Sequence, residues 1–189
     1  MEITTKFIEL KKGKVKINGI KEKETCLNFL EKTALKIFLF GKELYEEKFV
    51  SFDQIYKATQ NGFSSSNFHK NCDGKTKLIV IIKSNKYVFG GYNDIGWNSV
   101  SKFVETKNSF IFSLSNPQGK PVLLDPVKFQ YSIYDDASSG PCFGGGYDIC
   151  IRDKPNKSTK NFTNIGHTYK GKTKILFTFF FKFFLRIRI

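Results

Sequence analysis

The stretch KLIVIIKSNKYVFGGY, residues 77–92, decides the fold class of this chain. Residues 78–82 form a strongly apolar run of the length expected for a buried strand. A turn signal follows at 84–85, and 87–89 is the returning strand. The glycine pair 90–91 ends that strand, because glycine marks a bend or a close approach of the backbone. The stretch therefore predicts two neighbouring strands joined by a tight turn.

Short strand patterns recur after this pair. Residues 108–114 alternate between large apolar and mostly polar side chains, and a turn signal follows at 116–119. Further strands are predicted at 121–124, 131–134 and 147–151. Strands at roughly ten-residue spacing, with little helix between them, are typical of antiparallel sheets packed face to face.

Helical patterns are confined to the first part of the chain. Residues 25–40 place apolar side chains on one helical face, although the end of that run, 36–40, reads equally well as a strand. Residues 52–59 predict a short helix. A second short helix follows, with Ser64 or Ser65 as its N-cap.

Composition and charge narrow the class of protein. The chain has 189 residues and 40% hydrophobic residues, enough for the core of one domain, so wholesale disorder is excluded. Its net charge is +14, but residues 170–189 hold six basic and no acidic side chains. The remaining +8 is spread among interspersed Lys and Glu, as on an ordinary solvated surface. No helix-turn-helix, zinc finger or RNA-binding aromatic signature is present, so we expect no nucleic-acid partner.

The cysteines and the first residues bear on compartment. The start of the chain has no apolar run after its first charges, so we expect no secretory signal and a cytoplasmic protein. Cys26, Cys72, Cys142 and Cys150 show no framework spacing, and we expect all four to be reduced thiols. The tail from residue 175 is apolar but too short and too often interrupted by Lys and Arg for a spanning helix.

Two glycine-rich motifs, each containing Phe-Gly-Gly, lie in order along the chain with a tryptophan and a strand between them. The motif residues are Gly62, Phe63, Asp73, Gly74, Phe89, Gly90, Gly91, Tyr92, Trp97, Phe110, Phe112, Tyr134, Gly140, Pro141, Phe143, Gly144, Gly145, Gly146, Asp148, Gly166 and His167. In these residues the chain resembles the TLDc domain family over about residues 50–170.

The resemblance implies a mostly-β (α+β) fold, in which two antiparallel sheets form a β-sandwich flanked by a few short helices. It divides the chain into an N-terminal lead-in (1–49), a TLDc-like domain (50–170) and an atypical tail rich in Phe, Lys and Arg (171–189). The family normally continues to a last strand with acidic residues, and this tail has none. We interpret the tail as a departure from the family, with a truncated end, a mispredicted exon boundary or a frameshift as the plain alternative.

The residues themselves offer weak candidates for chemistry. Asp148, after the second glycine run, is the first candidate for a functional carboxylate, and Cys142 is the candidate for a peroxide-reacting thiol. The glycine runs could cradle an anion, but tight bends are the more common use. His69 and Cys72 have metal-like spacing, yet a zinc site normally shows two such pairs. We therefore predict no metal and no cofactor.

The functional prediction follows from the resemblance. It implies a non-enzymatic protein-interaction module in oxidative-stress protection, with subunits of the vacuolar proton-pumping ATPase as protein partner. One alternative is an enzyme or direct antioxidant that uses Cys142 or Asp148. A weaker alternative is binding to a membrane surface through the tail, residues 171–189, whose Phe, Lys and Arg suit an interface.

Overall fold

The computed structural model describes residues 4–12, 50–157, 161 and 163–171. The elements in chain order are β1 Thr4–Lys12, β2 Val50–Lys57, α2 Ala58–Asn61, α3 Ser65–Cys72, β3 Leu78–Ser84, β4 Tyr87–Asn93, β5 Lys102–Val104, β6 Phe110–Ser115, β7 Val122–Pro126, the 3₁₀ helix η1 Phe129–Tyr131, β8 Ile133–Asp135, β9 Ser139–Phe143, β10 Ile149–Arg152 and β11 Tyr169–Lys170.

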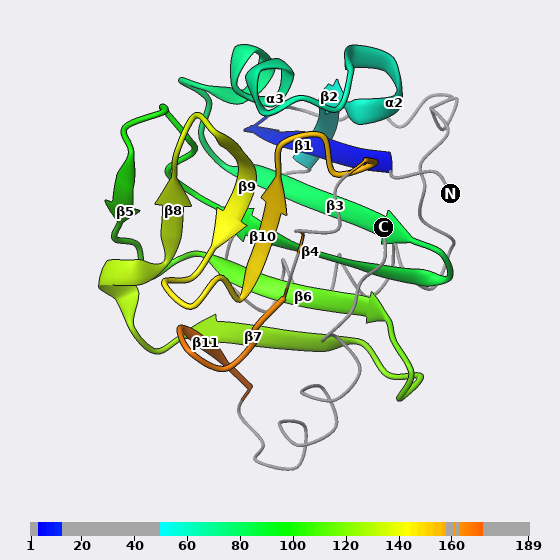
Figure 1. The fold of residues 1–189 in the computed structure, drawn as a ribbon. Coiled ribbons are helices and arrows are strands. Elements are labelled where there is room, and N and C mark those ends of the chain that lie inside the picture. Colours follow the sequence, from blue (N-terminus) through cyan, green and yellow to red (C-terminus); the bar gives the residue numbers. More distant parts are fainter. Residues whose placement is uncertain (1–3, 13–49, 158–160, 162, 172–189) are drawn as a thin grey trace.

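Within these residues the strands form two antiparallel sheets. The larger has seven strands in the order β11-β7-β6-β4-β3-β1-β2, and the smaller has four in the order β10-β9-β8-β5. In Figure 1 the strands of the larger sheet lie one below another, the smaller sheet lies against its left part, and α2 and α3 lie at the upper end. The predicted β-sandwich with a few short helices is confirmed.

The predicted hairpin is the centre of the larger sheet. Ser84 of β3 pairs with Tyr87 of β4, so the turn has two residues, and Asn85 adopts the left-handed conformation that such turns require (φ 53°). The apolar run of β3 is buried throughout. Leu78, Val80 and Ile82 share one face of the strand and belong to the core between the sheets.

The two glycine motifs meet where the sheets pack together. A Cβ on Gly91 of β4 would lie 2.6 Å from Cζ of Phe143, so the missing side chain makes room for that ring. Phe143 belongs to β9, and its ring also packs edge-on against Trp97 at 5.6 Å between centroids. Trp97 in turn contacts Phe68 of α3 at 5.4 Å. Residues from both motifs and the capped helix therefore close one aromatic core.

The helix predictions met different outcomes. The second short helix is confirmed as α3, and its N-cap is Ser64, whose hydroxyl accepts from the Asn67 backbone N–H at 3.1 Å. The helix predicted at 52–59 is wrong, because the chain stays extended as β2 through Lys57 and only the four residues of α2 are helical. The extended form is held by antiparallel pairing with β1, a long-range contact that local pattern does not show.

β1 comes from the segment predicted as a lead-in. It lies between β3 and β2 in the larger sheet, where Phe7 pairs with both Val80 and Tyr56. The alternatives weighed for 25–40 and the tail 172–189 fall outside the described residues. In the described part of the chain, no helix combines the length and the apolar character needed to cross a membrane.

Candidate functional site

The second glycine run forms the tight connection between β9 and β10. A Cβ on Gly145 would lie 2.9 Å from Cβ of Tyr131, and one on Gly146 would lie 2.3 Å from Cβ of His167. Gly144 has φ 86°, a conformation that side chains disfavour, and its added Cβ would collide with Asp148. The glycines are therefore required for close packing against neighbouring segments.

The backbone N–H groups of this run are used within the fold. The Gly144 N–H donates to the carbonyl of Ser132 at 2.9 Å, and the Gly145 N–H donates to the hydroxyl of Thr168 at 2.9 Å. An anion cradle needs successive N–H groups aimed at one external point. The arrangement instead fits the bend interpretation of the glycine run.

Asp148 fastens the 166–169 segment to the glycine run. Its carboxylate is completely buried and accepts hydrogen bonds from the backbone N–H groups of Gly166 (2.8 Å), Thr168 (3.1 Å) and Tyr169 (3.2 Å). Burial raises the pKa of Asp148, although the three backbone donors act to lower it. The structure thus places the first candidate for a functional carboxylate inside the fold, with its oxygens occupied by backbone donors.

The cysteine prediction is corrected by the structure. Cys142 and Cys150 form a disulfide, and their Cα atoms lie 4.1 Å apart as direct cross-strand partners in β9 and β10. Seven intervening residues in the sequence concealed this pairing, because the glycine turn folds the two strands back on each other. Cys72 is the free, fully buried thiol, and burial raises its pKa far above the ordinary range. Cys26 lies outside the described residues.

A disulfide-bonded Cys142 has no thiol to react with a peroxide. The peroxide-reacting role predicted for it therefore requires prior reduction of the bond. Buried Cys72 does not replace it, since a raised pKa keeps the nucleophilic thiolate scarce.

A polar cluster that the sequence did not predict lies between α3 and the small sheet. His69 is buried, and its Nδ1 lies 2.7 Å from Oδ1 of Asp73 and 2.9 Å from Oγ of Ser99. Its Nε2 contacts the backbone carbonyls of Asp136 (3.1 Å) and Ser139 (2.8 Å). His69 therefore does not share a site with Cys72, and the described residues contain no group of three or more metal-binding side chains.

The same cluster holds the residue types of a catalytic triad but not its geometry. A triad places the serine hydroxyl on one ring nitrogen and the carboxylate on the other. Here the Ser99 hydroxyl and the Asp73 carboxylate share Nδ1 of His69, and the hydroxyl donates to Asp73 at 2.6 Å. Since Nε2 is occupied by two carbonyls, the cluster joins three segments of the fold and does not activate the serine.

The adjacent aspartates also serve local structure. Asp135 is buried and accepts from the backbone N–H groups of Asn98 (2.8 Å) and Ser99 (2.9 Å). Asp136 accepts from the backbone N–H of Ser138 at 2.8 Å and from its hydroxyl, and these bonds lower the pKa of Asp136. The two carboxylates do not converge, in agreement with the turn interpretation.

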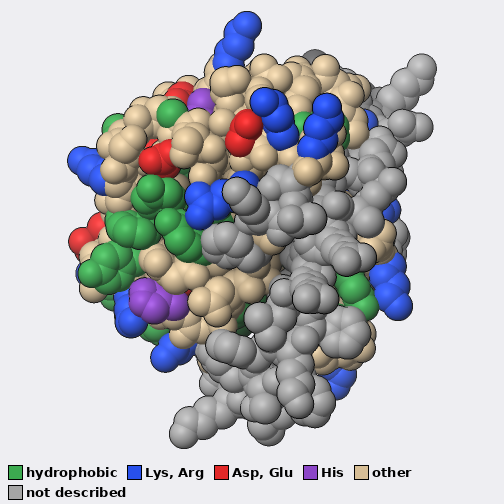
Figure 2. Space-filling model, in the orientation of Figure 1, with side chains coloured by type: hydrophobic (Ala, Val, Ile, Leu, Met, Phe, Trp, Pro, Cys, Tyr) green, Lys and Arg blue, Asp and Glu red, His purple; other side chains and the backbone are tan. Residues whose placement is uncertain are grey.

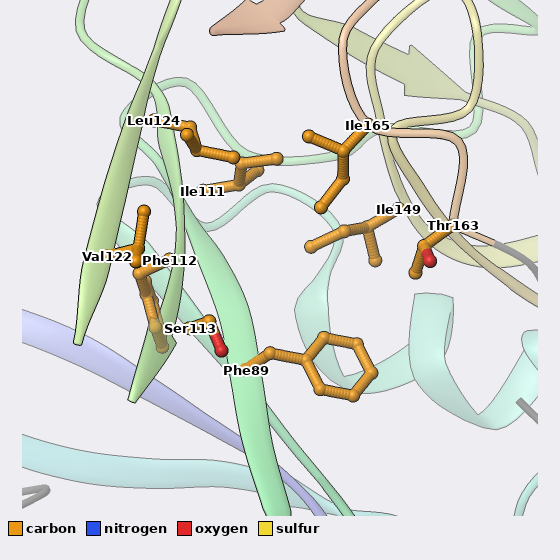
Figure 3. Close-up of a pocket in the computed structure, with 9 residues that line it drawn as sticks. All are labelled: Phe89, Ile111, Phe112, Ser113, Val122, Leu124, Ile149, Thr163 and Ile165. Atoms are coloured by element: carbon orange, nitrogen blue, oxygen red, sulfur yellow. The ribbon is translucent and has the colours of Figure 1, made fainter. Parts of the chain in front are cut away.

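A narrow cleft lies between the two sheets (Figure 3). Its cavity volume is about 10 Å³, room for about one water molecule. Leu124 and Ile111 of the larger sheet face Ile149 and Ile165 across it, and Phe89 closes one end. Among the described residues that line the cleft, none has an ionisable side chain, and the space is too small for a substrate.

Aromatic side chains gather on the outward face of the smaller sheet. We call Phe103, Tyr131, Tyr134 and Tyr147 the aromatic surface; their rings are half-buried, or exposed in the case of Tyr131. Figure 2 shows hydrophobic side chains on the left of this face, with a histidine at their lower edge. This surface was not predicted from the sequence, although the alternation of Ile133 and Tyr134 in β8 is a sign that their side chains point to opposite faces.

The fold and these sites define a two-sheet β module whose glycine motifs build its core. The family model of the TLDc domain matches residues 20–183, well over half of the chain. The chain therefore belongs to the TLDc domain family, and the resemblance predicted from its motifs is confirmed. The match reaches beyond 50–170 at both ends and includes much of the tail. Neither the comparison with curated proteins nor that with solved structures gives a match.

Proposed function

We propose that this chain is a non-enzymatic protein-interaction module that acts in oxidative-stress defence by binding the vacuolar proton-pumping ATPase. Membership of the TLDc domain family supports the proposal, because the family resemblance implies both the stress role and, in several members, the pump as partner. We further propose that the protein works in the cytoplasm, where the cytoplasmic face of such a pump is accessible.

One structural observation carries the non-enzymatic part of the proposal. The side chain that sequence reasoning favoured for chemistry, Asp148, is buried and holds the 166–169 segment through three backbone hydrogen bonds. An acid or base that acts on a substrate must come within hydrogen-bond reach of it. A fully buried carboxylate with occupied oxygens serves the fold, and the accessible aromatic surface serves contact with a partner.

The experiment is a pull-down between the immobilised full chain and the purified, assembled proton-pumping ATPase. We expect the pump to be retained by beads that carry the chain and absent from beads that carry no protein. Recovery of no pump subunit by the wild-type chain contradicts the pump as partner.

The direct-antioxidant alternative has one observation in its favour, the proximity of Cys142 and Cys150. In such a reaction the two thiols lose two electrons and two protons to form the disulfide, and a peroxide is reduced to an alcohol and water. Peroxide consumption by the pre-reduced protein is compared with that of Cys142→Ser. Equal background rates exclude this activity, and we expect that result.

The membrane-surface alternative concerns residues 171–189, of which the structure describes only Gly171. Co-sedimentation with anionic liposomes, with and without residues 170–189, decides it. Binding that depends on the tail supports this role in place of a partner-bound module.

A further inference from the structure

The aromatic surface is a continuous row of rings across β5, β8 and the loops beside them. The ring centroid of Phe103 lies 5.3 Å from that of Tyr131 and 5.0 Å from that of Tyr134. Tyr134 continues the row to Tyr147 at 5.6 Å. Phe103 and Tyr134 are cross-strand partners, so β-sheet pairing itself fixes the spacing at the middle of the row.

The row is partly accessible to a partner, and a disulfide holds together the strands beside it. Tyr131 is 38% exposed, a large fraction for a ring of its size in a folded domain. In the neighbouring strand, Cys142 is the cross-strand partner of Tyr134 and is bonded to Cys150, which holds β9 and β10 together. The other rings of the row are half-buried and therefore lose little side-chain freedom on binding, and Tyr is among the residues that dominate binding energy at interfaces.

Basic side chains surround this row. Lys107 and Lys128 are exposed. The Lys107 ammonium stands 5.5 Å from the ring centroid of Phe129, which shares η1 with Tyr131, and the Lys128 ammonium lies 3.2 Å from Nε2 of His167. At the other end of the row the Arg152 guanidinium stands 4.9 Å from the ring centroid of Tyr147. Positive charge near both ends of the aromatic surface favours an anionic partner.

Two acidic groups offset part of this charge. Asp136 accepts from the Tyr134 hydroxyl at 3.2 Å, and hydrogen bonds from Ser138 lower its pKa and keep it ionised. Glu105 is the exposed carboxylate between Lys102 and Lys107 in the sequence. Lys107, Lys128 and Arg152 outnumber these two carboxylates, so the charge around the apolar aromatic centre is positive on balance.

The ring orientations discriminate between two kinds of anionic partner. Successive bases of a single-stranded nucleic acid stack on ring faces. Here the planes of Phe103 and Tyr131 meet at 87° and those of Tyr134 and Tyr147 at 83°, while the middle pair, Phe103 and Tyr134, is tilted at 46°, so no two neighbouring rings of the row are parallel. Such a herringbone row fits aliphatic side chains between the rings better than a stack of parallel bases.

We propose that the aromatic surface is the docking site for an acidic protein segment, whose aliphatic side chains pack between the rings and whose carboxylates meet the surrounding lysines. This inference rests on the proposed function, since it names the surface through which the interaction module holds its partner. It assigns binding to two residues that lie outside the glycine motifs, Phe103 and Tyr131, as well as to Tyr134 and Tyr147.

The test uses the full chain and fluorescein-labelled peptides in fluorescence anisotropy. The acidic probe is (Glu-Leu-Glu-Pro)₃, and the matched basic probe has Lys in place of Glu. Tyr131→Ala and Lys107→Glu remove one ring and one cation from the site. The matched controls are Tyr87→Ala and Lys86→Glu, because the Lys86 ammonium also stands 5.5 Å from the Tyr87 ring, at the far end of the β3–β4 hairpin (Figure 1).

We expect the acidic probe to bind and the basic probe not to bind. Tyr131→Ala and Lys107→Glu should each weaken binding by about fivefold or more, and the controls should stay within about twofold of wild type. Unchanged thermal midpoints, followed by Trp97 fluorescence, establish that the variants fold. Equal binding of both probes, or equal weakening by the control variants, overturns the proposal.

Two further arms separate this inference from the proposed function. The first arm measures the binding of a dT₁₂ oligonucleotide. If it binds more tightly than the acidic peptide, and if Tyr131→Ala abolishes this binding, the surface belongs to nucleic acid and the docking proposal is overturned. Failure of the pump pull-down with intact peptide binding removes the pump as partner and leaves the docking site standing. Undiminished pump binding by Tyr131→Ala and Lys107→Glu keeps the proposed function and refutes this surface.

Discussion

Replacement of Asp148 by alanine should destabilise the whole domain. The change leaves the backbone N–H groups of Gly166, Thr168 and Tyr169 without their acceptor at a site that is completely buried. A buried donor without a partner costs roughly 1–3 kcal/mol, so three of them predict a loss of at least about 3 kcal/mol. Since domains of this kind are stable by about 5–15 kcal/mol, the loss is a large share of the total.

The assay is urea unfolding followed by the fluorescence of Trp97, the single tryptophan of the chain, which is fully buried. With a slope of about 2 kcal/mol per molar urea, the midpoint should fall by about 1.5 M. Glu105→Ala, which removes an exposed carboxylate, is the control and should change stability by no more than about 0.5 kcal/mol. A loss below about 1 kcal/mol for Asp148→Ala would refute the structural role of this carboxylate.

Three further predictions use the same unfolding assay. Gly91→Ala should lower the free energy of unfolding by about 1–3 kcal/mol, because its Cβ would press on the Phe143 ring. The second substitution Phe143→Leu, made in the same chain, should restore part of that loss. Strictly additive losses in the double variant count against the contact. Replacing both Cys142 and Cys150 by alanine should lower the free energy of unfolding by up to about 2.5 kcal/mol, the value for a loop closed over a sequence separation of 8. Dithiothreitol should lower the stability of the wild type but not that of this double variant. Burial raises the pKa of Asp148, so the folded state keeps the carboxyl proton to a higher pH than the unfolded chain does. The stability of the wild type relative to Asp148→Asn should therefore fall as the pH rises above about 4. A rise in stability would show that the backbone donors lower the pKa by more than burial raises it.

Local pattern was sufficient where an element is shaped by its own residues. The β3–β4 hairpin follows from a continuous apolar run, a two-residue turn and a returning strand. The start of α3 follows from Ser64, whose hydroxyl replaces a missing backbone acceptor for Asn67. The cap and the turn act within a few residues, so they are visible in the sequence.

Local pattern failed where pairing is decided by distant segments. Residues 52–57 have a helix-compatible pattern, but they pair with β1 from the beginning of the chain and are therefore extended. β9 was concealed in the same way, since the residues before the second glycine run read as a loop signature although Cys142 pairs with both Tyr134 and Cys150. Backbone hydrogen bonds to a neighbouring strand outweigh intrinsic propensities, which amount to less than about 1 kcal/mol per residue.

In the candidate site, too, some residues were predicted from local motifs, and others meet only through tertiary packing. The motifs pointed to Asp148, Cys142 and the glycines, and the structure shows the carboxylate buried, the sulfur in a disulfide and the glycines in close contact. The His69–Asp73–Ser99 cluster and the aromatic surface were not predicted, because their members are scattered over the chain and meet only through sheet packing.

The sequence by itself determined the family, the antiparallel two-sheet architecture and the positions at which only glycine fits. These features depend on residue types and on spacings of a few residues, which are visible in the sequence without the structure. Tertiary structure alone decided which side chains are buried and stabilise the fold, and which remain exposed to a partner. Exposure is a property of packing: Ile133 and Tyr134 are neighbours in one strand, yet the first is sealed in the core and the second faces outward in the aromatic surface.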